Sequence, residues 1–224
     1  MIANALILLG SPKRMTGASA NLGNYIGGRL KADGLAVETM AAYGIAESTE
    51  DLEHLMESLD RADLLLVSFP LYWDTLPSGL TEAFLKIIEM KERLGNKKRS
   101  LAAVCNCGFP ESSNCHGALR SVELFGQRMG MEFLGGMAIG QGGVLGDGRL
   151  EDSSLFKKNL ARLGIAAGHL SKGERVPEAV IEELGRPFIP RFLYTLIGNM
   201  NWNSMAKKNG VRGKMRARPY EAHG

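Results

Sequence analysis

Residues 4–22 read NALILLGSPKRMTGASANL, and this stretch decides the fold. It begins as a short apolar run that stops at Gly10, continues through hydroxyl-bearing and basic residues, and then takes on helical spacing. Such a pattern predicts a buried strand, a loop and the start of a helix. We therefore expect an α/β protein whose first loop lies at the end of a buried strand.

The loop of this stretch has the composition of an anion site. The first amides of a helix have no partner inside it and carry the positive end of its dipole, so they attract a phosphate. Further donors and positive charges come from Ser11, Lys13, Arg14, Thr16 and Ser19. Because the loop matches neither G-x-x-x-x-G-K-[ST] nor G-x-G-x-x-G, it is expected to hold one terminal phosphate. The alternative is an ordinary strand-to-helix connection capped by Ser19 or Thr16.

Length and composition limit the kind of protein. The 224 residues are enough for one α/β domain, expected over 1–172, with a helical and basic extension over 173–224. No window of about 18 uncharged apolar residues occurs and no secretory signal is evident, so we expect a cytoplasmic protein. Three cysteines are a small and odd number, which argues against a disulfide framework.

The apolar pattern predicts five strands that alternate with five helices. Strands are expected at 3–9, 35–41, 63–69, 100–105 and 132–139. Helices are expected at 17–32, 49–60, 77–93, 112–129 and 152–171, the second capped by Ser48 or Thr49 and the last by Asp152 or Ser153. Several strands are apolar without alternation, which indicates a parallel sheet covered on both faces. A doubly wound sheet of order 2-1-3-4-5 binds its ligand where the carboxyl ends of strands 1, 3 and 4 meet.

Three loops should therefore converge at that edge, namely 10–22, 70–77 and 106–116. The second contains adjacent aromatic residues, Tyr72 and Trp73, which suit either a flat ligand such as a flavin or a cover for the core. In the third, backbone amides near Gly108 suit the edge of a ring system, with Phe109 packing on it. A glycine-dense loop, 140–148, follows the fifth strand.

A metal site is the weaker interpretation of the third loop. Cys105, Cys107, Cys115 and His116 have none of the usual zinc spacings. Cys105 is expected as a buried strand residue, and His116 in the first turn of the fourth helix.

Three motifs resemble the NADPH-dependent FMN reductase and iron-sulfur flavoprotein-like branch of the flavodoxin-like superfamily. They are GSPK with SANL (10–13 and 19–22), FPLYW with LP (69–73 and 76–77), and CGFPE (107–111). The resemblance covers roughly residues 1–170 and implies a flavodoxin-like fold. One departure stands out: residues 35–62 contain no cysteine, so the iron-sulfur cluster of some members is not expected.

The resemblance also implies a site for FMN. The phosphate would fall to Ser11, Lys13, Ser19, Asn21 and Leu22. The ribityl chain and ring would meet Pro70, Leu71, Tyr72 and Trp73, and the ring would also meet Asn106, Cys107, Gly108 and Phe109.

The implied function is an FMN-dependent oxidoreductase that passes electrons from NAD(P)H to a flavin, a quinone or another small acceptor. The cofactor would carry the redox chemistry, so no catalytic acid or base is assigned. A flavodoxin-type electron carrier without nicotinamide activity is the alternative, and an FMN-free binding or scaffold domain is a third.

The C-terminal segment is basic. From Arg186 to Gly224 there are eight Lys and Arg residues and one acid, Glu221, whereas residues 1–185 hold 19 basic and 23 acidic residues. Residues 191–208 suggest a helix. An arm that packs on its own domain or on a second subunit is the favoured interpretation, and a homodimer is expected. Weak contact with an anionic membrane surface is the alternative. Nucleic acid is not an expected partner, because aromatic residues do not interleave with the charges.

Overall fold

A five-stranded parallel sheet forms the centre of the computed structural model, which describes residues 2–146 and 148–218. The strands are β1 (Asn4–Leu9), β2 (Ala36–Ala41), β3 (Leu64–Pro70), β4 (Ser100–Asn106) and β5 (Glu132–Ile139). Their order in the sheet is β2-β1-β3-β4-β5, with each neighbouring pair parallel. The predicted doubly wound α/β sheet is confirmed, and each strand lies within a residue or two of its predicted range.

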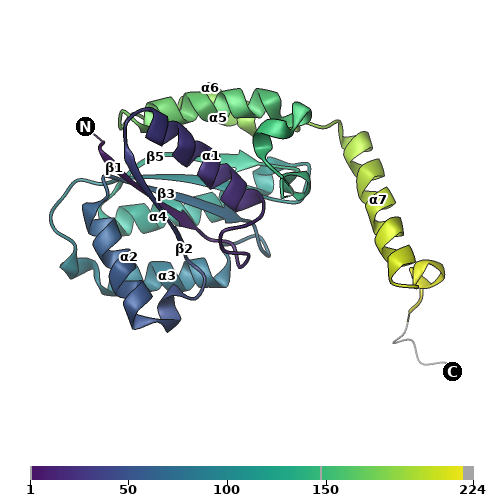
Figure 1. Cartoon of the computed structure of the whole chain (residues 1–224), viewed down its shortest axis with the longest axis horizontal. Coiled ribbons are helices and arrows are strands. Elements are labelled where there is room, and N and C mark those ends of the chain that lie inside the picture. Colours follow the sequence, from purple (N-terminus) through teal and green to yellow (C-terminus); the bar gives the residue numbers. More distant parts are fainter. Residues whose placement is uncertain (1, 147, 219–224) are drawn as a thin grey trace. The chain divides into compact units, whose positions relative to one another are not determined.

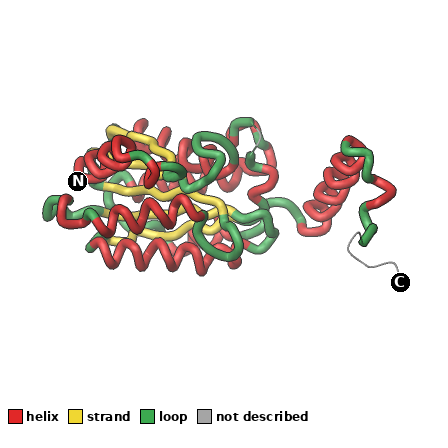
Figure 2. The backbone as a smooth tube through the Cα atoms, turned by 90° about the horizontal axis from the view of Figure 1, so that it is seen from below, coloured by secondary structure: helices red, strands yellow, loops and turns green. Residues whose placement is uncertain are grey.

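Helices cover both faces of this sheet (Figures 1 and 2). One face packs against α1 (Ala18–Ala32), α5 (Lys157–Leu170) and α6 (Glu178–Gly185). The other packs against α2 (Thr49–Arg61), α3 (Ser78–Glu89) and α4 (His116–Met129). Successive side chains of β1 therefore enter different cores, Leu6 and Leu8 on one side and Ile7 and Leu9 on the other. This double coverage explains why β1 and β3 are apolar at nearly every position.

Glycines let α1 lie close to the sheet. A Cβ atom on Gly23 would come within 2.8 Å of Leu9 Cδ2 and 3.1 Å of Ser68 Cβ, and one on Gly27 within 2.5 Å of Ile7 Cδ1. At the start of the helix, Ser68 Oγ donates a 2.6 Å hydrogen bond to the carbonyl of Ser19. The first turn of α1 is thus held against the carboxyl ends of β1 and β3.

Three predicted helix boundaries were wrong. The fourth helix was expected from residue 112, but α4 begins at His116 because a 3-10 turn, Ser112–Cys115, precedes it. The last predicted helix was expected from residue 152, but α5 begins at Lys157, because Ser153 is extended and the turns on either side of it place Leu150 and Phe156 in the core. Helix α3 ends at Glu89 instead of continuing to 93, and a short 3-10 turn, Lys91–Arg93, follows it. The predicted cap of α2 is confirmed, since Ser48 Oγ accepts a hydrogen bond from the N–H of Asp51.

Helix α6 has no counterpart in the predicted elements. Val176 donates a backbone hydrogen bond to Leu134 of β5, and Leu184 is fully buried. The chain accordingly divides into compact units at 1–188 and 189–224, later than the predicted boundary after residue 172. The second unit contains α7 (Arg191–Lys208), which matches the predicted helix. Among the described residues, no helix has the length and apolar character required to cross a membrane.

Candidate functional site

A pocket of about 360 Å³ lies at the carboxyl edge of the sheet, beyond β1, β3 and β4. Its volume falls in the range of small-molecule sites. All three predicted loops contribute to it, so their expected convergence is confirmed. Of the residues predicted to hold a cofactor, the lining brings together Ser11, Lys13, Ser19, Pro70, Leu71, Tyr72, Asn106 and Gly108.

A fourth loop, which follows β5, completes the lining with Gly142, Gly143 and Gly146. Glycine is required here because the loops approach each other closely. A Cβ atom on Gly142 would lie 2.7 Å from Asn106 Nδ2, and one on Gly140 would lie 2.5 Å from the carbonyl oxygen of Pro110. This loop was not among those predicted to form the site. The glycine density of 140–148, directly after the last strand of the same sheet edge, is the signal that would have found it.

The amino terminus of α1 faces this pocket through Gly17 and Ala18. No side chain caps the helix, and Gly17 before it has φ 86°, a value that favours glycine. Within the described residues, the backbone N–H groups of Ala18, Ser19 and Ala20 have no hydrogen-bond acceptor. The interpretation of the loop as a capped connection is therefore wrong, and the helix presents unpaired donors at the pocket.

Ser19 serves a different purpose from the one predicted for its hydroxyl. Its Oγ donates a 2.8 Å hydrogen bond to Asn106 Oδ1, and both residues are buried. This bond joins the first turn of α1 to the end of β4. Ser11, also buried, accepts a hydrogen bond from the N–H of Lys13 through its Oγ, which leaves its hydroxyl hydrogen able to donate.

Four other residues predicted for the phosphate do not line the pocket. Arg14 lies with its guanidinium carbon 6.0 Å from the centre of the Tyr43 ring. Thr16 Oγ1 donates to the carbonyl of Lys13. Asn21 Nδ2 donates to the carbonyls of Leu145 and Gly148 and so supports the fourth loop. Leu22 is fully buried in the core beneath α1.

Trp73 stands on an exposed turn next to the pocket-lining Tyr72. Tyr72 and Thr75 exchange two backbone hydrogen bonds of 3.1 and 3.0 Å, which closes a two-residue turn. Both central residues have positive φ, 49° for Trp73 and 59° for Asp74, as in a type I′ turn. The Trp73 side chain is 98% exposed, so it does not cover the core, which was the alternative to a ligand contact. Phe109, also predicted to contact the ring, is 56% exposed.

The three cysteines lie together on the face of the sheet opposite to α1. Cys105, Cys107 and Cys115 are buried in the core that packs under α3 and α4. Hydrogen bonding with Cys115, together with burial, raises the pKa of the Cys107 thiol, which therefore stays protonated at neutral pH. Cys107 is thus a core residue rather than a pocket-lining one. Among the described residues, no group of three His, Cys, Asp or Glu side chains is suited to a metal ion.

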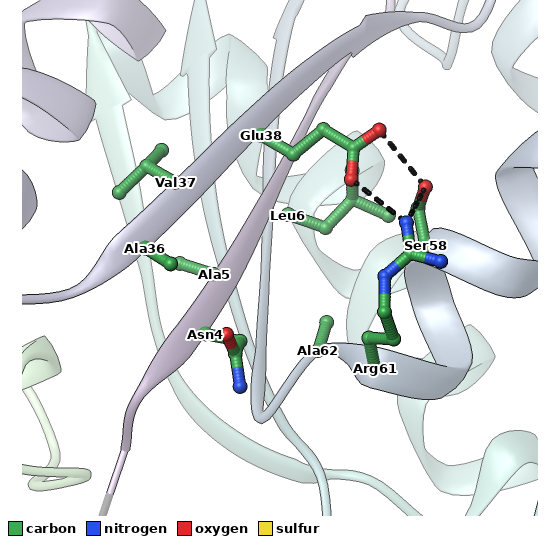
Figure 3. Close-up of a pocket in the computed structure, with 9 residues that line it drawn as sticks. All are labelled: Asn4, Ala5, Leu6, Ala36, Val37, Glu38, Ser58, Arg61 and Ala62. Carbon is green, nitrogen blue, oxygen red and sulfur yellow. Dashed lines mark hydrogen bonds and ion pairs between the residues drawn. The ribbon is translucent and has the colours of Figure 1, made fainter.

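A second cavity, of about 200 Å³, lies near the amino ends of β1 and β2 (Figure 3). Its polar side chains bond to one another: Glu38 accepts hydrogen bonds from Ser58 at 2.9 Å and from Arg61 at 3.3 Å. Glu38 also lies 2.9 Å from His54 Nε2. With these groups engaged among themselves, the carboxyl-edge pocket is the better candidate for a ligand.

Comparison with known proteins identifies the fold. No protein-family model matches the chain, and no curated protein matches it. Solved structures do match. A WrbA-like flavodoxin from Agrobacterium tumefaciens has a TM-score of 0.55 at 10% identity, covering 76% of this chain and 96% of that one. An FMN-dependent NADH-azoreductase from Bacillus anthracis, solved with FMN, has a TM-score of 0.54 at 13% identity, covering 75% and 99%. An NAD(P)H:quinone oxidoreductase from Methanothermobacter marburgensis has a TM-score of 0.52 at 22% identity, covering 75% and 95%. At these identities the comparisons show a flavodoxin-like fold.

Proposed function

We propose, from this flavodoxin-like fold and the pocket at its carboxyl edge, that the chain binds FMN and is an oxidoreductase. It would take electrons from NAD(P)H and pass them to a flavin, a quinone or another small acceptor. Two of the similar structures are described as an FMN-dependent NADH-azoreductase and an NAD(P)H:quinone oxidoreductase. Both names agree with this proposal.

The unpaired donors at the start of α1 are the observation that carries the proposal. Ala18 and Ser19, whose N–H groups are among them, line the pocket together with Ser11 and Lys13. None of the described lining residues is acidic. Backbone donors, a hydroxyl and a cation together suit a dianionic phosphate monoester.

The rest of the pocket lining suits a flat ring. Asn106 and Gly108 line it from the β4 side and Tyr72 from the β3 side. A Cβ atom on Gly108 would meet nothing within 4 Å, so the surface there is open to a ligand. The exposed ring of Trp73 on the neighbouring turn would gain a partner if it packed against a bound ring or its electron donor.

In this proposal FMN supplies the redox chemistry, accepting hydride and releasing one or two electrons. The residues of the chain bind and orient it. Ser11, Lys13 and the first turn of α1 would hold the phosphate, while Pro70, Leu71 and Tyr72 would lie along the ribityl chain and ring. The bond from Ser19 to Asn106 would hold the first turn of α1 against the end of β4, so that both elements keep their places in the pocket wall.

Titrations of the full chain with FMN and with riboflavin test whether the pocket binds the phosphate group, because the two flavins differ only by that group. We expect FMN to bind roughly a hundredfold more tightly than riboflavin, because hydrogen bonds to a charged group contribute about 1.5–3 kcal/mol each. Ser11→Ala with Lys13→Ala should remove most of that preference. The matched control, Ser121→Ala with Lys158→Ala, changes a partly exposed serine and an exposed lysine, neither of which lines the pocket, and should preserve the preference. Equal affinity of the wild type for the two flavins would contradict the phosphate site.

Anaerobic mixing of the FMN-loaded protein with NADH or NADPH tests the activity. Bleaching of the flavin within seconds is expected for an oxidoreductase. An FMN complex that stays oxidised for minutes with both donors would favour the flavodoxin-type carrier. A chain that binds no flavin at all would favour a scaffold.

A further inference from the structure

Apolar side chains occur on opposite sides of α7, within the second compact unit. Large exposed ones are Phe192, Leu196, Ile197, Met200, Trp202 and Met205. Leu196 and Met205 are nine residues apart, which is two and a half helical turns, so they face opposite directions. Met200 and Trp202, two residues apart, also face nearly opposite directions. A helix that is apolar on opposite sides is typically surrounded by other protein.

The same unit carries a strong positive charge. Residues 189–218 contain seven Lys and Arg residues and no Asp or Glu. Residues 1–188 have the opposite balance, 20 basic against 23 acidic. The two parts of the chain are therefore electrostatically complementary, and such complementarity favours association between them.

We propose that residues 189–218 form an assembly arm that binds the acidic body, residues 1–188, of a second copy of this chain. The apolar side chains of α7 would be buried in that contact, and Lys207 and Lys208 would face the acidic surface. Pairing between two arms would place like charges together, which opposes association. A helix lying on a membrane needs one polar face along its length, which α7 lacks. The inference does not depend on flavin binding.

The mass of the full chain in solution, measured by light scattering after size exclusion, tests the arm. We expect a dimer or larger assembly. The triple variant Phe192→Ser, Leu196→Ser, Met200→Ser should raise the dissociation constant of the assembly roughly tenfold or more. The double variant Trp202→Ser, Met205→Ser should do the same, because truncating large apolar side chains at the centre of an interface weakens binding by at least that factor. The control, Asn199→Ala with Asn201→Ala, changes exposed polar residues of the same helix and should leave the mass unchanged. Circular dichroism checks that every variant is folded.

Salt and charge reversal identify what the arm binds. Opposite charges attract less when screened, so an arm bound to an acidic body should dissociate more readily at high NaCl. Lys207→Glu with Lys208→Glu should weaken assembly at low salt for the same reason. Assembly that strengthens under either change would mean that arms pair with each other, which overturns the proposal. A chain that is monomeric in solution would overturn the proposal as well. If that monomer also co-floated with vesicles containing phosphatidylglycerol, the arm would be a membrane contact instead.

Discussion

At the scale of single residues, the wall of the pocket is held by hydrogen bonds between its own side chains and backbone. Ser19 Oγ donates to Asn106 Oδ1 at 2.8 Å, while Ser68 Oγ donates to the Ser19 carbonyl at 2.6 Å. These three buried residues come from α1, β4 and β3. A small polar network of this kind fixes the relative position of three elements, because each member loses a partner if one is removed.

Replacing Ser19 with alanine is therefore expected to destabilise the fold. We expect Ser19→Ala to lower the free energy of unfolding by about 1 kcal/mol, since Asn106 Oδ1 loses its donor. In an Asn106→Ala background the same change should cost less, with a coupling of roughly 0.5 kcal/mol or more in urea unfolding. Ser121→Ala, which changes a partly exposed serine whose hydroxyl bonds within its own helix, is the control. Strictly additive effects would show that the 2.8 Å bond does not stabilise the protein.

At the scale of elements, the placement of α1 follows from its small residues. Gly23 lies against Leu9 and Ser68, whereas a Cβ atom on Gly28 would meet nothing within 4 Å. The close approach brings the first turn of the helix to the pocket, so packing along the helix also determines where its free N–H groups lie. The fourth loop depends on glycine in the same way, at Gly140 and Gly142.

Two alanine substitutions in α1 should accordingly have opposite effects. Gly23→Ala is expected to destabilise by about 1–3 kcal/mol, because the added methyl group meets the Cβ of Ser68, which cannot rotate away. Gly28→Ala should stabilise by about 0.5–1 kcal/mol, since alanine favours the helix and the site is open. Thermal or urea unfolding of both variants provides the measurement. A Gly23→Ala variant as stable as the wild type would show that α1 can move away from the sheet at no cost.

At the scale of the whole molecule, the carboxyl and amino ends of the parallel strands differ in what they carry. The carboxyl edge carries the pocket, and the amino edge is held by a partly buried carboxylate. Asp63 Oδ2 accepts hydrogen bonds from the N–H groups of Ala3 and Asn4, and its Oδ1 lies 2.6 Å from Lys97 Nζ. Burial by itself raises the pKa of Asp63, but the hydrogen bonds from Lys97, Ala3 and Asn4 outweigh it and lower the pKa from 3.8 to about 2.

This carboxylate predicts how stability depends on acid. A lowered pKa in the folded state means that the contribution of Asp63 is complete above its unfolded value near 4 and is lost as the pH falls towards 2. We expect up to about 2 kcal/mol from this group at neutral pH. The difference in unfolding free energy between the wild type and Asp63→Asn should therefore shrink between pH 4 and pH 2. Asp33→Asn, at an exposed position, is the control, and a difference that does not change with pH would contradict the assignment.

The amino-acid sequence was enough to predict the alternation of strands and helices, the parallel sheet with its strand order, and the loops that meet at one edge. The strands and helices follow from local patterns, because apolar periodicity and helix start signals act over a few neighbouring residues. The strand order and the meeting of the loops follow from the way doubly wound sheets are built. The motifs around Ser11 and Tyr72 also pointed to the edge of the sheet where the pocket lies.

Only the tertiary structure decided which atoms of those loops remain free to bind. It directed the Ser19 hydroxyl to Asn106, placed Cys107 in the opposite core, added the glycine loop after β5 and packed α6 against β5. The reason is that hydrogen-bond partners and close contacts come from residues far apart in the chain, and no local pattern records which of them meet.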